Sequence, residues 1–377
     1  MSEYQYYEFT AVDRPLTGRE RAELRSLSTR ADITATSFVN TYEWGNFKGD
    51  PRTLMERYFD AHLYLANWGT RQLMLRLPKH VLEPATVARY CQGDSASAWT
   101  AGTHVIIDLH DEDEDGTDEW DLDGHGLLTS IIPVRAGLAA GDLRLLYLAW
   151  LRCVQSEEIA DDEPEPPVPA GLGTLDAPLT AVAEFLRIDP DLIAAAAAGS
   201  APAAAGEPTA AQLRKWVVGL PARDKDAILT DLITGGDSHL RNRLLRRYRV
   251  AHPTDALTPT AVRTAGQLLA TAADLRAERE RRDAEQRESD RVRRERSAAA
   301  ARQRHLDTLA VDQPAAWQRV DELIATKKPR EYDTAVQLLG ERDGDSASFR
   351  DRLAELRAVH ARKPSLLERL NLAGLDT

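Results

Sequence analysis

An acidic stretch holds the side chains whose spacing comes closest to a known chemistry. Asp111, Asp113 and Asp115 match the D-x-D-x-D-G opening of an EF-hand loop, whose carboxylates bind Ca²⁺. The twelfth position of such a loop needs a bidentate glutamate, and here it is Leu122. Residues 108–123 contain ten acids and neither Lys nor Arg. We therefore expect a solvated acidic loop, with calcium at these three aspartates as the lesser alternative.

A basic helix is the second candidate for binding. Residues 239–249 read HLRNRLLRRYR, so leucines and a tyrosine form one face of the expected helix and arginines form the rest. Such a helix suits phosphates or an acidic partner. A solvated basic face is the simpler interpretation, because the net charge of -12 disfavours generic binding to a phosphate backbone. The candidate binding residues are Arg241, Arg243, Arg246, Arg247 and Arg249.

The sequence matches none of the common motifs for catalysis or cofactor binding. The sequence GDSAS occurs at 93–97 and at 344–348, but neither copy is a G-x-S-x-G nucleophile motif. Gly235-Gly236 has no Lys-Ser/Thr after it, so it is not a phosphate-binding loop. Cys91 and Cys153 are too few for a cysteine-rich zinc site. We expect no catalytic residue, cofactor or metal, and an enzyme with a site in the N-terminal module stays open as an alternative.

Composition indicates where the chain resides. No apolar run reaches the roughly 18 residues that a membrane span needs, and the N-terminus lacks a basic region followed by an apolar one. Two cysteines in a chain of this length favour a reducing compartment. We therefore expect a soluble, cytoplasmic protein that does not contact membranes, and leave its oligomeric state open.

Residues 1–156 are expected to form an α+β module. Strand composition appears at 4–12, 33–44 and 103–109, and 61–77 reads as a hairpin. Helices are expected after Thr17 and after Asp50-Pro51, where capping residues precede helix formers. An apolar helix that follows Asp142 ends the module. The order of the strands cannot be read from one sequence.

The remainder is expected to be mainly α-helical. An acidic, Pro-rich linker at 157–173 should separate the module from a helical middle region at 174–256. A long Arg/Glu-rich helix should follow at 257–310, and a C-terminal helical module at 311–377. We expect the tail helices to bind a protein partner through their apolar faces, which include Leu323, Val336, Leu339, Leu353 and Leu356.

The long helix admits two interpretations, a coiled coil and a solvated single helix. Between Arg276 and Arg296 the apolar side chains are two alanines and a valine, which disfavours a tight zipper. Acid–arginine pairs at i,i+4 and i,i+3 each contribute about 0.2–0.5 kcal/mol. We favour a spacer helix with apolar ends, and a weak antiparallel association as second choice. The predicted pairs include Glu278–Arg282, Asp283–Arg287, Glu288–Arg291 and Asp290–Arg293.

Residues 210–375 contain Trp317, Tyr332 and the stretch HARKPSLL at 360–367. Through these residues the segment resembles the C-terminal helical region of actinobacterial SWIM zinc finger proteins. The zinc motif C-x-C…C-x-H is absent from this chain, so the metal site of that family does not transfer. The resemblance implies a helical scaffold for protein contacts in a nucleic-acid-related setting. The leading expectation is a non-catalytic interaction or scaffold protein, and the alternative is nucleic-acid binding through Arg241–Arg249.

Overall fold

The computed structural model describes residues 4–112, 123–202, 208–234, 239–251, 262–311, 313–340 and 347–375. The chain divides into two compact units, Met1–Arg279 and Glu280–Thr377. The first unit contains an antiparallel sheet with helices and the second is helical, so the predicted α+β module followed by a mainly α-helical region is confirmed. None of the described helices is both long and apolar enough to cross a membrane.

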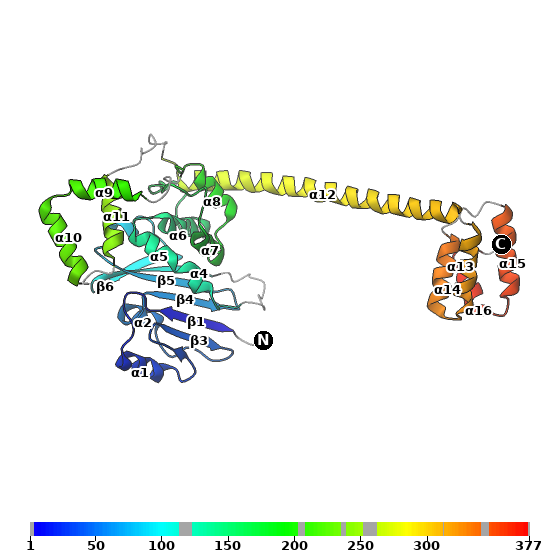
Figure 1. The fold of residues 1–377 in the computed structure, drawn as a ribbon, viewed down its shortest axis with the longest axis horizontal. Helices are drawn as coiled ribbons and strands as arrows, with labels where there is room; N and C mark the ends of the chain where they lie inside the picture. The colour runs from blue at the N-terminus through cyan, green and yellow to red at the C-terminus, as the bar shows by residue number, and fades with distance from the viewer. Residues whose placement is uncertain are drawn as a thin grey trace. The chain divides into compact units, whose positions relative to one another are not determined.

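The sheet of the first unit has seven strands in the order β2-β3-β1-β4-β5-β7-β6 (Figure 1). All its strand pairs are antiparallel. The strands are β1 Gln5–Thr10, β2 Asp32–Ile33, β3 Ser37–Tyr42, β4 Ala61–Ala66, β5 Arg71–Pro78, β6 Ala96–Ala101 and β7 His104–Asp111. The predicted hairpin is β4–β5, and Gly69 at its turn has φ 99°, a conformation that glycine adopts without a steric penalty.

Alternating side chains send the apolar residues of this sheet into two cores. Phe9 and Phe38 lie in the core on one face, where α1 (Gly18–Leu27) and α2 (Pro51–Arg57) pack. Leu65 and Ile107 lie in the core on the other face, which continues into the helices that follow the sheet. These helices are α4 Leu127–Ile131, α5 Pro133–Ala139, α6 Arg144–Gln155, α7 Ala177–Phe185 and α8 Pro190–Ala197.

Local signals in the sequence placed several helix ends correctly. Thr17 forms the predicted capping box with Glu20 at the start of α1. Asp50 caps α2, and Pro51 occupies its first turn. Strand β6 was not predicted, because ASAWTA has little strand composition and GDSAS suggested only a turn. Its pairing with β7, which contributes Ile106 and Ile107, stabilises a strand that its own residues favour only weakly.

The segment expected as a linker is packed into the first unit. Ile159 and Leu172 are buried there, and the isolated bridge from Pro164 to Thr264 joins the segment to the start of α12 (Ala265–Val311). Arg263 donates to Glu165, whose carboxylate also accepts from the Tyr147 hydroxyl. Acidic and proline-rich composition therefore marks an extended segment here and does not mark a boundary; the division between the units falls at Arg279.

Helix α12 belongs to both units, with residues up to Arg279 in the first. Leu268 and Ala272 are buried, so the N-terminal apolar end docks as predicted. Arg279 pairs with Asp191 on α8 at 2.7 Å. Among the predicted pairs along the helix, Glu288–Arg291 at 2.6 Å and Asp290–Arg293 at 3.0 Å are present, and Arg291 also pairs with Glu295.

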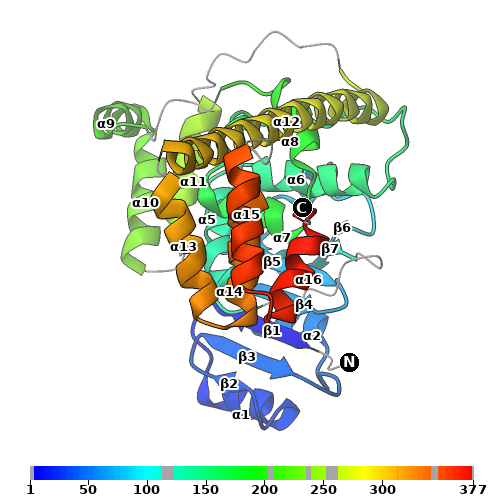
Figure 2. The ribbon, with the colours of Figure 1, turned by 90° about the vertical axis from the view of Figure 1, so that its right-hand side faces the viewer.

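The rest of the second unit is a bundle of four short helices (Figure 2). They are α13 Gln313–Ala325, α14 Pro329–Gly340, α15 Ala347–Val359 and α16 Pro364–Leu372. Their apolar faces form one core that includes Trp317, Ile324 and Leu370. The remaining helices of the first unit are α3 Pro84–Val87, α9 Ala210–Gly219, α10 Ala222–Thr234 and α11 Leu240–Ala251.

Candidate functional site

Helices α9 and α10 leave several large apolar side chains exposed to solvent. Neither helix has a buried residue. On α10, Leu232 is 65% exposed and Ile233 is 83% exposed; on α9, Val218 is 70% exposed. Five of the nine large hydrophobic side chains that are exposed in the described part of the first unit lie on these two helices. Clustered apolar side chains that a protein's own fold does not cover are typical of an interaction site.

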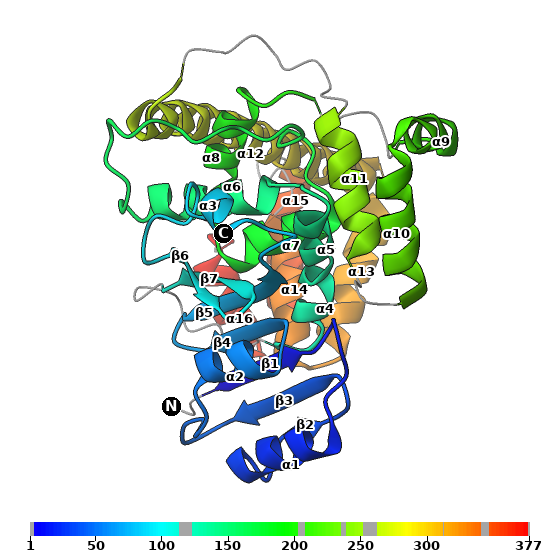
Figure 3. The same cartoon turned by 90° about the vertical axis from the view of Figure 1, so that its left-hand side faces the viewer.

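The exposed side chains of α10 form a stripe. Leu229, Leu232 and Ile233 are spaced i, i+3, i+4, so they lie on one side of the helix. Asp224 and Asp231 lie on the opposite side, which faces α11: Asp224 pairs with Arg247, and Asp231 pairs with Arg243. Helices α10 and α11 run side by side in Figure 3. The apolar stripe is therefore turned away from the element that holds α10 in place.

Helix α9 is held by one contact on its side and one at its C-terminal end. The Trp216 ring lies edge-on to Tyr248 of α11, with their centroids 5.6 Å apart. The Lys225 ammonium donates to the Val218 carbonyl at 2.8 Å, which fixes the corner between α9 and α10. We call the exposed side chains Val217, Val218, Leu229, Leu232 and Ile233 the α9–α10 face.

The arginines of α11 do not form the free basic patch that the sequence suggested. Arg243 and Arg247 hold the acids of α10, and Arg246 donates to the Val81 carbonyl at 2.6 Å and lies 3.5 Å from Glu83. Arg241 is exposed, and the side chain of Arg249 lies outside the described residues. Helical periodicity identified an amphipathic basic helix, but it could not show that the neighbouring elements supply the acids.

A buried charge cluster ties α11 to the sheet, and no motif in the sequence indicated it. Asp60 is fully buried and accepts from Arg76 at 2.8 Å and from the Val12 and Asp13 amides. Arg135 of α5 binds both carboxylate oxygens of Asp13, at 2.9 and 2.6 Å. The charges compensate one another, so the cluster is explained by packing of the first unit.

The same cluster reaches the first residue before α11. His239 Nε2 lies 3.2 Å from Asp13 Oδ1. Burial raises the pKa of Asp13, but hydrogen bonds from His239 and Arg135 outweigh it and lower the pKa below its usual value. Asp13 therefore stays ionised and anchors the start of α11, and with it the helices that carry the exposed face.

Asp111 is held by arginines and is not arranged as a calcium ligand. Asp111 is the last residue of β7, is buried, and pairs with Arg152 at 2.7 Å and with Arg187 at 2.9 Å. Asp113 and Asp115 lie outside the described residues. No group of three potential metal-binding side chains occurs within the described ranges. A buried carboxylate that two guanidinium groups neutralise is a structural anchor.

In the described part of the N-terminal module, aromatic side chains fill the core. The Phe9 ring stacks on His62 with centroids 3.9 Å apart, and Phe38 and Phe59 pack beside it. Burial lowers the pKa of His62 to about 4, so the ring is neutral near pH 7. Burial also raises the pKa of both Cys91 and Cys153 to about 12, which keeps both thiols protonated and weakly nucleophilic.

The residues predicted to bind a partner in the tail are the core of the bundle. Leu339 and Leu353 are each 1% exposed. Their neighbours in that core include Leu323, Val336 and Leu356, all of which are buried. The prediction that these faces meet a partner is wrong, because four short amphipathic helices bury them against one another. The spacing of leucines predicts that a helix has an apolar face. Which residues pack against that face is decided by the tertiary fold.

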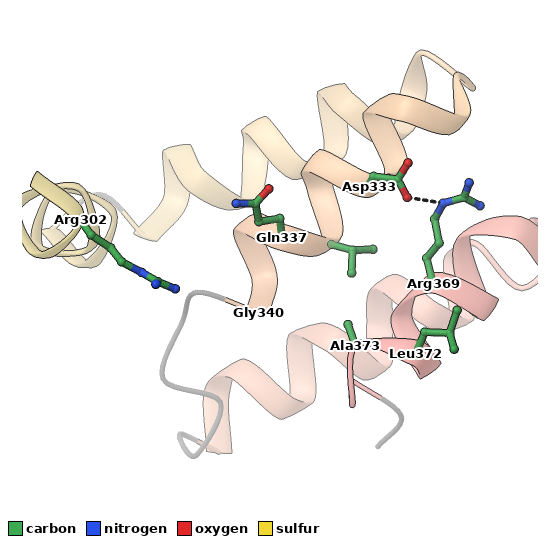
Figure 4. Close-up of a pocket in the computed structure, with 8 residues that line it drawn as sticks. Arg302, Asp333, Gln337, Gly340, Arg369, Leu372 and Ala373 are labelled. Atoms are coloured by element: carbon green, nitrogen blue, oxygen red, sulfur yellow. Dashed lines mark hydrogen bonds and ion pairs between the residues drawn. The ribbon is translucent and has the colours of Figure 1, made fainter. Parts of the chain in front are cut away.

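A groove of about 510 Å³ lies on the surface of the second unit (Figure 4). Arg302 of α12, Gln337 of α14 and Leu372 of α16 lie along it. Arg369 donates to Asp333 at 2.5 Å, so these two charges compensate each other. The other lining side chains are neutral, and Arg302 alone adds charge. The groove suits an apolar group beside an anion, but it selects a ligand less sharply than the α9–α10 face.

Comparisons of this chain with protein-family models, with curated proteins and with solved structures found no match. The geometry of the α9–α10 face and of the bundle is therefore the basis for the functional argument.

Proposed function

We propose that this chain is a non-catalytic interaction protein whose first unit binds a protein partner through the α9–α10 face. One observation carries the proposal: two successive helices with no buried residue expose five large apolar side chains. Removing apolar surface from water contributes about 25 cal/mol per Å², so such a face is stabilised when a partner covers it.

A protein partner agrees better with this face than a nucleic acid does. Phosphate binding needs basic side chains that are free to release counterions. Arg243, Arg246 and Arg247, the centre of the predicted basic patch, already bind acids or a carbonyl within the first unit. The α9–α10 face consists of valine, leucine and isoleucine side chains, and the buried centre of a protein interface is more apolar than the rest of the surface.

The resemblance of residues 210–375 to SWIM zinc finger proteins includes α9, α10 and α11. It implies a scaffold for protein contacts, and this agrees with the proposed role. The family relationship itself stays a prediction. In the second unit the predicted binding residues lie in the core of the bundle, so they provide no docking surface there.

The test is a comparison of three forms of the full-length protein. The wild type, Leu232→Ser/Ile233→Ser, and the control Val359→Ser/Leu372→Ser are each used to retain proteins from a lysate of the source cells. The control removes two side chains of similar exposure from the second unit. We expect at least one protein that the control retains and the α10 variant loses, and that binds the wild type when both are purified.

The proposal fails if the three forms retain the same proteins in the same amounts. It also fails if every protein lost from the α10 variant shows no binding to the purified wild type. Circular dichroism of each variant verifies that its helix content is unchanged, which separates loss of the face from loss of the fold.

A further inference from the structure

Strand β6 forms an open edge of the sheet in the first unit. It lies at the end of the strand order, and within the described residues it pairs with β7 and with no other strand. Edge strands are usually protected by charged side chains, by proline, by a bulge or by being very short. The other edge strand, β2, has two residues and includes Asp32. Strand β6 has six residues, ASAWTA, with no charge, no proline and an unbroken register against β7.

The backbone of β6 directs hydrogen-bonding groups toward its outer side. The His110 amide donates to the Ser95 carbonyl at 2.8 Å, so Ser95 directs its backbone groups toward β7. In an antiparallel pair this direction alternates from one residue to the next. Ala98 and Thr100 therefore direct both their N–H and their C=O groups away from β7. Both residues are exposed, and no described strand lies beside them.

We propose that β6 pairs with β6 of a second copy of this chain, antiparallel, about a two-fold axis at Trp99. In this register Ala98 of each copy lies opposite Thr100 of the other. Each such pair exchanges two hydrogen bonds, because the groups of both residues point across the axis. The two sheets become continuous. This contact is separate from the α9–α10 face and does not depend on the proposed function.

The side chains of β6 agree with pairing about this axis. The Trp99 indole N–H donates to Glu56 at 2.8 Å, and the Arg52 guanidinium lies 4.0 Å from the ring centroid, so the ring is held on one face of the sheet. The two Trp99 residues form a pair without backbone hydrogen bonds, where side chains approach most closely. Aromatic pairs at such positions stabilise a sheet. Because β6 carries no charged side chain, its two-fold pairing brings no like charges of the strand together.

The opposite edge of the sheet does not provide an equal partner for β6. Pairing of β6 with β2 of the next copy would be head-to-tail, and such contacts build open chains unless they close into a ring. Strand β2 offers two residues to such a contact. The two-fold contact uses all of β6 on both copies and closes as a dimer, so it is the pairing that the strand lengths favour.

The first experiment measures the mass of the full-length protein by sedimentation over a range of concentrations. We expect a reversible dimer in the wild type. Thr100→Pro removes an N–H that points away from β7, so the monomer keeps its own strand pairing. It should raise the dimer dissociation constant at least about tenfold. Ala98→Lys/Thr100→Lys should act likewise through like charges at the axis, while Thr41→Lys, an exposed threonine of β3, should not.

The second experiment tests the register by cross-linking. Residues at the axis face their own copies with Cα atoms about 4.5 Å apart, within the range of a disulfide. Trp99→Cys should therefore form a disulfide-linked dimer under mild oxidation. Ser97→Cys is the control, because Ser97 lies on the same strand two residues from the axis and faces Ala101 of the other copy. Equal cross-linking of the two variants would overturn the register.

Three outcomes would overturn the inference. The first is a wild type that stays monomeric at every concentration, whether or not an extended peptide binds to β6. The second is a dimer that Thr100→Pro and the lysine variant leave unchanged, with circular dichroism showing that both are folded. The third is a dimer lost in Leu232→Ser/Ile233→Ser and kept in Thr100→Pro, which would assign the second copy to the α9–α10 face. Retention of a different protein by the α9–α10 face is judged separately, since the β6 variants leave that face intact.

Discussion

Two sets of helices, α9–α10 and α13–α16, have similar lengths and similar spacing of apolar residues. They differ in how far those apolar residues are buried. Both regions have short helices of 9 to 13 residues with leucines or valines at helical spacing. The bundle helices cover one another, so Leu339, Leu353 and Leu366 are almost fully buried. Helices α9 and α10 contact α11 through ion pairs and the Trp216–Tyr248 ring contact, and five of their large apolar side chains stay exposed.

The difference shows that the contact which holds a helix in place decides what its apolar side chains are free to do. A bundle uses them for its own stability. A helix held by polar contacts on one side keeps its apolar side available for another molecule. The comparison can be tested through stability first and through finer effects afterwards.

The largest effect is expected inside the bundle. Leu353→Ala removes a side chain that is 1% exposed from the core of the second unit. The lost burial and the cavity should lower the free energy of unfolding by about 2–5 kcal/mol. Urea unfolding, followed by circular dichroism, measures it. A change below about 0.5 kcal/mol would show that this leucine does not pack as a core residue.

Acid should affect the sheet of the first unit more than the bundle. His62 has its pKa lowered to about 4 by burial, against 6.5 for an ordinary histidine. The unfolded chain therefore binds a proton at a pH where the folded chain does not, and stability is lost as pH falls from 6.5 toward 4. The loss from this histidine should be about 2 kcal/mol between pH 7 and pH 5.

Unfolding of the wild type and of His62→Leu at pH 7 and pH 5 isolates that contribution. The substitution removes the titrating ring and should flatten the dependence on pH by the stated amount. Equal pH dependence in the two forms would mean that His62 titrates normally in the folded protein.

The anchor of α11 should have an effect of similar or smaller size that stays local. Asp13→Ala removes the carboxylate that lies between Arg135 and His239. We expect a loss of about 2 kcal/mol, since hydrogen bonds to charged groups contribute roughly that much. Hydrogen exchange should then show faster exchange in α9, α10 and α11, while exchange in α13 to α16 stays as in the wild type.

The smallest effect on stability is expected at the α9–α10 face itself. Leu232→Ser/Ile233→Ser replaces side chains that are 65% and 83% exposed. Exposed substitutions usually change the free energy of unfolding by no more than about 0.5 kcal/mol. Thermal unfolding at the concentration used for binding checks this. A loss as large as that of Leu353→Ala would mean that the face supports the fold, and the comparison between the two regions would collapse.

The parts of the fold that depend on neighbouring residues were predictable. Thr17 with Glu20, and Asp50 with Pro51, start helices through hydrogen bonds and backbone angles that span only a few residues. Strand β6 was not predictable, because Ala96–Ala101 becomes a strand by pairing with β7. Nor was the charge cluster at Asp60, because Asp13, Asp60, Arg76 and Arg135 are far apart in sequence and meet only in the folded unit.

The candidate site shows the same limit. The sequence marked the arginines of α11 and the apolar side chains of the tail; the structure uses Arg243, Arg246 and Arg247, and the tail side chains, internally. The exposed side chains of α9 and α10 carried no separate signal, since WVVGL and AILTDLI have the spacing of any packed helix.

Taken alone, the sequence determined most strands and helices of the sheet unit apart from β6, the helical character of the second half, two of the ion pairs along α12 and the absence of the SWIM cysteine motif. These properties follow from propensity, periodicity and residue type, which act over a few positions. Only the tertiary structure decided which apolar faces are covered and which arginines are neutralised. Whether an apolar face is covered, or an arginine is paired with an acid, depends on residues from distant parts of the chain. A local sequence pattern does not identify those residues.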